Sequence, residues 1–114
     1  MEEFDIAIIG GGPAGIMAAI AASADLNVVL LEKNSSLGSK LLITGGGRCN
    51  ITNEKPIKKL LNSFHDKNFL KHSFYTFTNE MLLDLFRNRG LDFIVEDNNR
   101  VFPETEKSQD ILAL

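Results

Sequence analysis

The sequence lacks the features that mark secreted, membrane-spanning and nucleic-acid-binding proteins. It holds a single cysteine, Cys49, which excludes an intramolecular disulfide framework and suits a reducing compartment. No apolar run reaches the length of a membrane span, and the acidic segment 1–3 has the wrong charge for a secretory signal. The net charge of −3 gives no support to nucleic-acid binding, which favours a basic patch. We therefore expect a cytoplasmic protein with neither a membrane nor a nucleic-acid partner.

Residues 5–32 contain, in order, an apolar strand, a glycine-rich turn, a helix, a second apolar strand and an acid. In the turn, Gly10 permits a sharp reversal, Gly12 lets the backbone approach a pyrophosphate, and Gly15 lets the helix lie close to the strand. The helix N-terminus offers free N–H groups to the phosphates. Glu32 ends the second strand, where its carboxylate can accept both hydroxyls of an adenosine ribose. This order predicts a dinucleotide site, because a glycine turn in an ordinary βαβ unit needs neither three glycines nor the acid.

We expect the first strand over residues 5–10, a helix from Pro13 to about residue 24, and the second strand over 27–32. Proline suits the first turn of a helix. Residues 33–55 are rich in Gly, Ser, Asn and Thr, and they predict a long loop with little regular structure. Loops of that length in compact domains are usually functional.

Two amphipathic helices are predicted after this loop, from the apolar stripes at 69–77 and 81–86. Thr78 is expected to cap the second helix, and Gly90 to end it. A hairpin of two strands over 91–96 and 100–102 should follow, because turn residues separate two apolar runs.

The chain is too short for a complete dinucleotide-binding sheet, which usually needs five or six strands. It supplies two clear parallel strands, and residues 110–114 read as the beginning of a further helix, for which Ser108 is the expected cap. We therefore expect an α/β fold in which residues 1–114 are the N-terminal portion of a longer domain.

A second glycine cluster, Gly45–Gly47, favours FAD over NAD as the expected cofactor. Consecutive glycines allow close backbone approach, and Arg48 can bind a phosphate bidentately. Asn50, Thr52 and Asn53 can hydrogen-bond the edge of a heterocycle. This arrangement suits a long cofactor held first at its ADP end and then at its far end, which favours FAD. An exposed turn, an NAD-dependent dehydrogenase fragment and a non-catalytic dinucleotide-binding module remain the alternatives.

The segments GSKLLITGGGRCNITN and NRVFPETEKSQDIL resemble the aminoacetone oxidase-type FAD-binding family, the BaiN/YhiN-like flavoproteins. The resemblance covers essentially all 114 residues, and Asn99 stands where the family usually has glycine. It implies the N-terminal βαβ of a Rossmann-like FAD-binding domain of the two-dinucleotide-binding-domain type, incomplete in this chain. The implied activity is that of an FAD-dependent oxidoreductase, acting on small amines or on carbon–carbon double bonds, with NAD(P)H as a candidate electron donor.

The resemblance also assigns cofactor contacts. Glu32 would bind the ribose and Lys33 would lie beside the adenosine. The pyrophosphate turn would comprise Gly10, Gly12, Pro13, Ala14 and Gly15. The residues implied to run along the phosphates towards the flavin are Lys40, Thr44, Gly46, Gly47, Arg48, Cys49 and Asn50.

No catalytic residue and no metal site is expected within this segment. A flavin–disulfide relay needs two cysteines, whereas Cys49 stands alone and is expected to be a small, buried, inert residue. His65 and His72 have no acid or cysteine partner at a useful spacing. Chemistry on a small-molecule substrate is therefore expected to depend on residues outside these 114.

Overall fold

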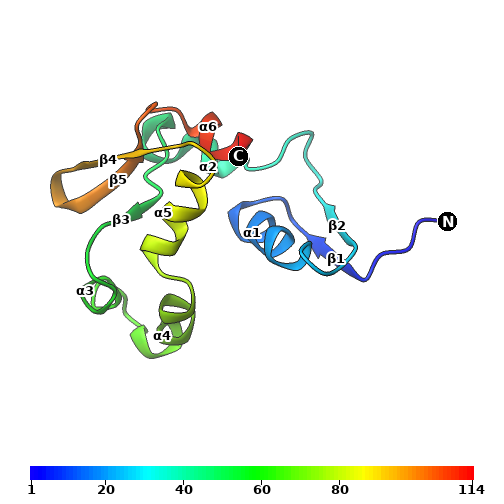
Figure 1. Ribbon diagram of the computed structural model, residues 1–114, viewed down its shortest axis with the longest axis horizontal. Coiled ribbons are helices and arrows are strands. Elements are labelled where there is room, and N and C mark those ends of the chain that lie inside the picture. The colour runs from blue at the N-terminus through cyan, green and yellow to red at the C-terminus, as the bar shows by residue number, and fades with distance from the viewer.

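A computed structural model describes residues 1–114 and confirms the predicted βαβ unit (Figure 1). Strand β1 (Ile6–Ile9) leads through the glycine turn into α1 (Pro13–Ala22), and β2 (Val28–Leu31) follows. The two strands are parallel, with Ile6 opposite Val28 and Ile9 opposite Leu31. Proline occupies the first turn of α1, as expected. The α/β fold class is therefore confirmed, with a sheet of two strands in place of a full parallel sheet.

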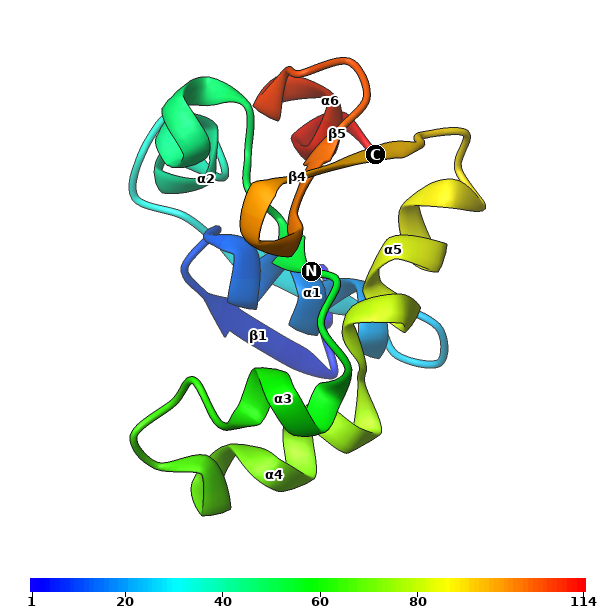
Figure 2. The ribbon, with the colours of Figure 1, turned by 90° about the vertical axis from the view of Figure 1, so that its left-hand side faces the viewer.

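The rest of the chain forms a second unit around a small antiparallel sheet with the strand order β3-β5-β4 (Figures 1 and 2). Its elements are α2 (Ser39–Ile43), the 3-10 turn η1 (Thr44–Gly47), β3 (Thr52–Asn53), α3 (Ile57–Leu61), α4 (Lys67–Thr76), α5 (Asn79–Arg87), β4 (Phe93–Glu96), the 3-10 turn η2 (Asp97–Asn99), β5 (Arg100–Pro103) and α6 (Ser108–Ala113). The two predicted amphipathic helices and the predicted hairpin are confirmed as α4, α5 and β4–β5.

Turn chemistry explains the two ends of α5 and the hairpin. Thr78 caps α5 as predicted, because its hydroxyl accepts a hydrogen bond from the Met81 amide at 3.2 Å. Gly90 takes φ +87° in the turn that follows. Asn98 and Asn99 have φ of +62° and +59°, so both adopt the left-handed geometry that asparagine tolerates.

Two expectations were wrong. Residues 33–55 are not a long irregular loop, because α2, η1 and β3 lie within them. Ser108 does not cap α6: it is the first helical residue, and its hydroxyl donates to the Leu42 carbonyl at 2.8 Å. This bond ties α6 to α2, which is a tertiary contact that local sequence does not encode.

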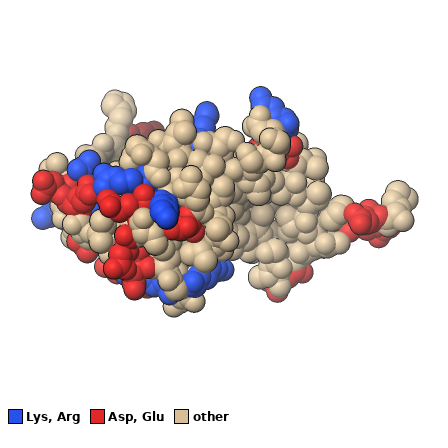
Figure 3. Space-filling model, turned by 90° about the horizontal axis from the view of Figure 1, so that it is seen from above, with Lys and Arg blue, Asp and Glu red and all other residues tan.

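The hydrophobic core lies in the second unit. Cys49, Phe86, Leu91 and Ile111 form a buried cluster, and every buried side chain of the molecule lies at or beyond Cys49. Helix α1 is apolar on nearly all sides, yet none of its residues is buried. Figure 3 accordingly shows a broad uncharged surface between the charged end of the hairpin and the acidic N-terminus. No helix is both long and apolar enough to traverse a bilayer.

Candidate functional site

The first glycine turn is built so that glycine is needed at two positions. Gly10 has φ +102°, and its amide donates to the Leu31 carbonyl at 2.7 Å, which fixes the turn against the end of β2. A Cβ on Gly15 would overlap the carbonyl oxygen of Gly10. The close approach of α1 to the strand, predicted from the glycine at position 15, is thus confirmed.

Gly12 differs from Gly15, because a Cβ built on it would meet no protein atom within 4 Å. Gly12 is the N-cap of α1 and supplies no side-chain cap, so no side chain competes for the first N–H groups of the helix. Pro13 and Ala14 are exposed beside it. The turn therefore presents an open, uncapped helix N-terminus, which is the arrangement that binds phosphate groups.

Glu32 lies immediately after β2, and its carboxylate contacts the glycine turn. One oxygen accepts from the Gly11 amide at 2.7 Å, and the other accepts from the backbone and side-chain nitrogens of Asn34 at 2.8 and 2.7 Å. The Asn34 and Gly11 amides lower the pKa of the Glu32 carboxyl below its usual range. An ionised acceptor is thereby held at the position where the sequence predicts a ribose.

The second glycine loop follows a left-handed path. Gly45, Gly46 and Gly47 have φ of +56°, +68° and +87°, and Cys49 takes +62°. A Cβ on Gly45 would lie 2.8 Å from the Asn50 amide nitrogen and 2.9 Å from the Phe102 ring. Gly46, by contrast, faces open space. Gly45 is thus required by packing within the protein, whereas Gly46 leaves backbone accessible to a ligand.

Arg48 has partners within the protein. Its guanidinium donates to Glu96 at 2.6 Å and to Glu106 at 3.0 Å, and it stacks on the Phe102 ring 4.1 Å from the centroid. The side chain is still 32% exposed, so its predicted contact with a phosphate stays a prediction. The ion pair raises the pKa of Arg48 and lowers that of Glu96. Sequence analysis missed these three partners because they are distant in the chain.

Cys49 is 3% exposed, and burial raises the pKa of its thiol. The expectation that Cys49 is buried is confirmed, and a protonated, buried thiol is a poor nucleophile. No group of three or more His, Cys, Asp or Glu side chains is placed to hold a metal ion.

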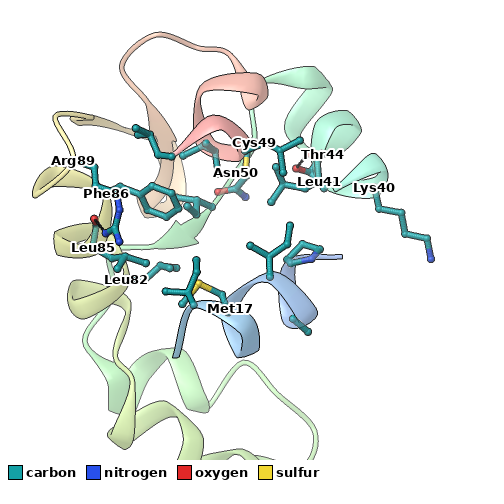
Figure 4. Close-up of a pocket in the computed structure, with 18 of the residues that line it drawn as sticks. Met17, Lys40, Leu41, Thr44, Cys49, Asn50, Leu82, Leu85, Phe86 and Arg89 are labelled. Atoms are coloured by element: carbon teal, nitrogen blue, oxygen red, sulfur yellow. Dashed lines mark hydrogen bonds between the residues drawn. The ribbon is translucent and has the colours of Figure 1, made fainter. Parts of the chain in front are cut away.

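A cleft of about 670 Å³ lies between α1 and the second unit, and residues next to both glycine loops line part of it (Figure 4). Six of the predicted site residues line it, namely Pro13, Ala14, Lys40, Thr44, Cys49 and Asn50. Lys40 lies at the rim and extends away from the cleft in Figure 4. The predicted residues that do not line the cleft are Gly10, Gly12, Gly15, Glu32, Lys33, Gly46, Gly47 and Arg48.

The remaining wall of the cleft is apolar and was not predicted as part of a site. Met17 of α1 faces three residues of α5 across the cleft, namely Leu82, Leu85 and Phe86 (Figure 4). The amphipathic stripe of α5 was visible in the sequence, but its pairing with α1 depends on the tertiary fold. A mostly apolar cleft with a few polar groups at one end is typical of cofactor sites.

Comparison with known proteins agrees with this geometry. The model of the HI0933-like protein Rossmann domain matches residues 4–114. The chain is 36% identical to a 3-dehydro-bile acid delta(4,6)-reductase of Clostridium scindens and 34% identical to a ribosomal RNA dihydrouridine synthase of Escherichia coli. Each match covers 96% of the chain and 27% of the relative. A ferredoxin–NADP reductase of Bacillus pumilus is 50% identical over 44 residues, 38% of the chain and 13% of that protein.

The chain thus spans about a quarter of the length of the two relatives that match it nearly throughout. Its residues fit a dinucleotide, because the turn leaves Gly12 open, the N-terminus of α1 is uncapped and Glu32 is ionised beside it. The family resemblance of the TGGGRCN loop is confirmed. The chain belongs to the HI0933-like Rossmann domain family.

Proposed function

We propose that residues 1–114 are the N-terminal portion of the FAD-binding domain of an oxidoreductase that reduces a carbon–carbon double bond. The observation that carries this proposal is one cleft lined by residues next to both glycine loops, with Pro13 and Ala14 from the start of α1 and Thr44 and Asn50 from either side of the second glycine cluster. A mononucleotide occupies one loop, whereas FAD is long enough to engage both.

In this proposal the chain's own residues bind and orient the cofactor. The turn at Gly10–Gly12 and the N-terminus of α1 hold the pyrophosphate, and Glu32 holds the ribose hydroxyls. Thr44, Gly46 and Asn50 continue the contact along the cofactor. Bound FAD supplies the hydride acceptor and donor, and the protein supplies position and electrostatics.

The names of the relatives indicate the reaction class. One is a reductase of a delta(4,6) bile acid and another forms dihydrouridine in ribosomal RNA. Both names describe the addition of hydrogen across a carbon–carbon double bond. We therefore propose such a bond as the substrate's reactive group, with either a steroid-like small molecule or an RNA uridine as its carrier.

NAD(P)H is the proposed electron donor, with support from the ferredoxin–NADP reductase relative. We also propose a cytoplasmic location, because the one cysteine of the chain is a buried free thiol that needs no oxidising compartment. No residue of 1–114 is proposed as a catalytic base.

The substitution Gly12→Val tests the cofactor site in the full polypeptide. A Cβ on Gly12 meets no protein atom within 4 Å, so the apoprotein should still fold, with a melting temperature lowered only by the less favourable N-cap. The branched side chain would fill the space that the pyrophosphate needs, and we expect FAD affinity to fall between about 5-fold and 150-fold, the equivalent of a steric cost of about 1–3 kcal/mol. Flavin absorbance retained after dialysis measures the effect.

Two outcomes would count against the proposal. If Gly12→Val retained stoichiometric flavin, the pyrophosphate would lie elsewhere. If the full protein purified with NAD and no flavin, the NAD-dependent dehydrogenase alternative would be correct. Addition of NADPH to the anaerobic holoprotein should bleach the flavin absorbance, and a flavin that no nicotinamide reduces would contradict the proposed donor.

A further inference from the structure

The charges of this acidic chain are segregated. Residues 55–76, which include α3 and α4, contain five lysines and one acid, whereas the rest of the chain holds seven basic and fourteen acidic residues. We call residues 55–76 the basic arm. The basic arm thus carries a net charge of +4, although the whole chain carries −3. The expectation of no nucleic-acid partner was based on the net charge of the whole chain.

Four lysines of the basic arm are exposed and form no ion pair, although Lys67 donates a hydrogen bond to Asn62 at 3.4 Å. Lys58, Lys59, Lys67 and Lys71 are all exposed. None of them belongs to an ion pair, since the four ion pairs of the structure involve arginines only. Burial of unpaired ammonium groups is costly, so this surface is not suited to packing against another part of the polypeptide.

The apolar side of the arm is used within it only in part, since Phe69 of α4 is 81% exposed. The rings of Phe64 and Phe74 stack edge to face with centroids 5.2 Å apart, and Leu61 of α3 is buried. Helices α3 and α4 lie side by side, below the strands and α5 in Figures 1 and 2. The outward side of α4 is consequently a surface that no element of the structure covers.

This outward side of α4 has a defined composition. A shallow concavity there is lined by Asn68, Lys71, His72, Tyr75 and Thr76, and Tyr75 is 53% exposed. Lys67 lies one turn before Lys71 on the same helix. The concavity and the neighbouring Lys67 thus combine two ammonium groups, hydrogen-bonding groups and one exposed aromatic ring within three turns of α4.

We propose that the basic arm binds single-stranded RNA, with Lys67 and Lys71 on phosphates and a base stacked on Tyr75. Cationic side chains beside an exposed aromatic ring are the elements of single-stranded nucleic-acid recognition. The concavity itself offers an anionic membrane no aliphatic side chain, because Asn68, His72, Tyr75 and Thr76 line it beside Lys71. The choice of RNA rests on the proposed function, in which an RNA uridine is one of two candidate substrates.

Fluorescence anisotropy on the full FAD-loaded polypeptide tests the proposal, with a fluorescein-labelled, uridine-rich single-stranded RNA as the probe. The double variant K67E/K71E should weaken binding at least about tenfold. The slope of the logarithm of affinity against the logarithm of salt concentration should fall by the amount that about one to two phosphate contacts contribute. Tyr75→Ala should weaken binding between about 5-fold and 150-fold, whereas Tyr75→Phe, which keeps the ring, should bind like the wild type.

Lys107→Glu is the matched control, because it reverses an exposed charge outside the arm and should leave RNA affinity unchanged. Flavin content and the rate of flavin reduction by NADPH should be normal in every variant. These two measurements test the oxidoreductase proposal independently of RNA binding. The inference is overturned if the wild type does not bind the RNA, if K67E/K71E and Lys107→Glu behave alike, or if vesicles containing phosphatidylserine bind and RNA does not.

Discussion

At the scale of single residues, Arg48 joins the second glycine loop to distant parts of the chain. The three glycines before it leave the loop with few restraints of its own, and the guanidinium binds Glu96, Glu106 and the Phe102 ring. We propose that Arg48 is a positioning residue, which fixes the loop so that the loop backbone can contact the cofactor.

Arg48→Ala should lower the melting temperature of the full polypeptide more than Arg87→Ala does. Arg87 forms an exposed pair with Asp84 within one helix, and such pairs contribute little. Arg48→Lys should recover only part of the loss, because an ammonium cannot bind two carboxylates in a planar fork. Thermal denaturation compares the three variants, and equal melting temperatures for Arg48→Ala and Arg87→Ala would contradict the positioning role.

Gly15→Ala probes the other loop at the same scale. The added methyl group would overlap the Gly10 carbonyl oxygen, which belongs to the backbone and cannot rotate away. We expect a loss of about 1–3 kcal/mol in the free energy of unfolding, measured by urea denaturation. Gly12→Ala is the matched control and should be close to neutral, because its Cβ meets nothing and its φ of −79° suits alanine.

At the scale of elements, local signals explain what the sequence could predict. The βαβ unit follows from glycine positions, apolar runs and Pro13, all within 30 residues of one another. The second loop could not be predicted in the same way, since the Arg48 partners Glu96 and Glu106 lie 48 and 58 residues away. The one-turn helix α3 has too few residues for a periodic pattern. The wall that α5 contributes to the cleft likewise depends on packing and not on local sequence.

The ion pair between Arg48, which follows η1, and Glu96 of β4 makes the attachment of the second glycine loop dependent on pH. Arg48 lowers the pKa of Glu96, so the carboxylate stabilises the folded state above its ordinary pKa of 4.5. This contribution is lost as the pH falls below about 4.5 and through the lower folded-state pKa. We expect the melting temperature to decline over that range, and Glu96→Gln to show a shallower decline; identical slopes would contradict the assignment. The pKa of Glu32 is also lowered, by the amides around it. Glu32→Gln therefore serves as the parallel variant, which removes the corresponding carboxylate beside the first glycine turn.

At the scale of the whole molecule, too much surface is exposed for a chain of this size. The accessible area is 7984 Å², against about 6,200 Å² for a folded monomer of 12.6 kDa. The radius of gyration is 15.3 Å, against about 13 Å for a compact domain of this length. Only 13 of 114 residues are buried, and α1 contributes none of them. The βαβ unit therefore has apolar faces and strand edges that this chain does not cover.

This excess of apolar surface gives the last prediction. Residues 1–114 expressed alone should bind FAD weakly, melt without a sharp transition and bind the dye ANS, because β1 and β2 have open edges and α1 has no buried side chain. The full polypeptide, measured under the same conditions, should melt cooperatively and keep its flavin. Calorimetry and ANS fluorescence on both proteins make the comparison. A monomeric 114-residue protein with a single sharp transition and tightly bound FAD would mean that the second unit alone, through Cys49, Phe86, Leu91 and Ile111, stabilises the cofactor site.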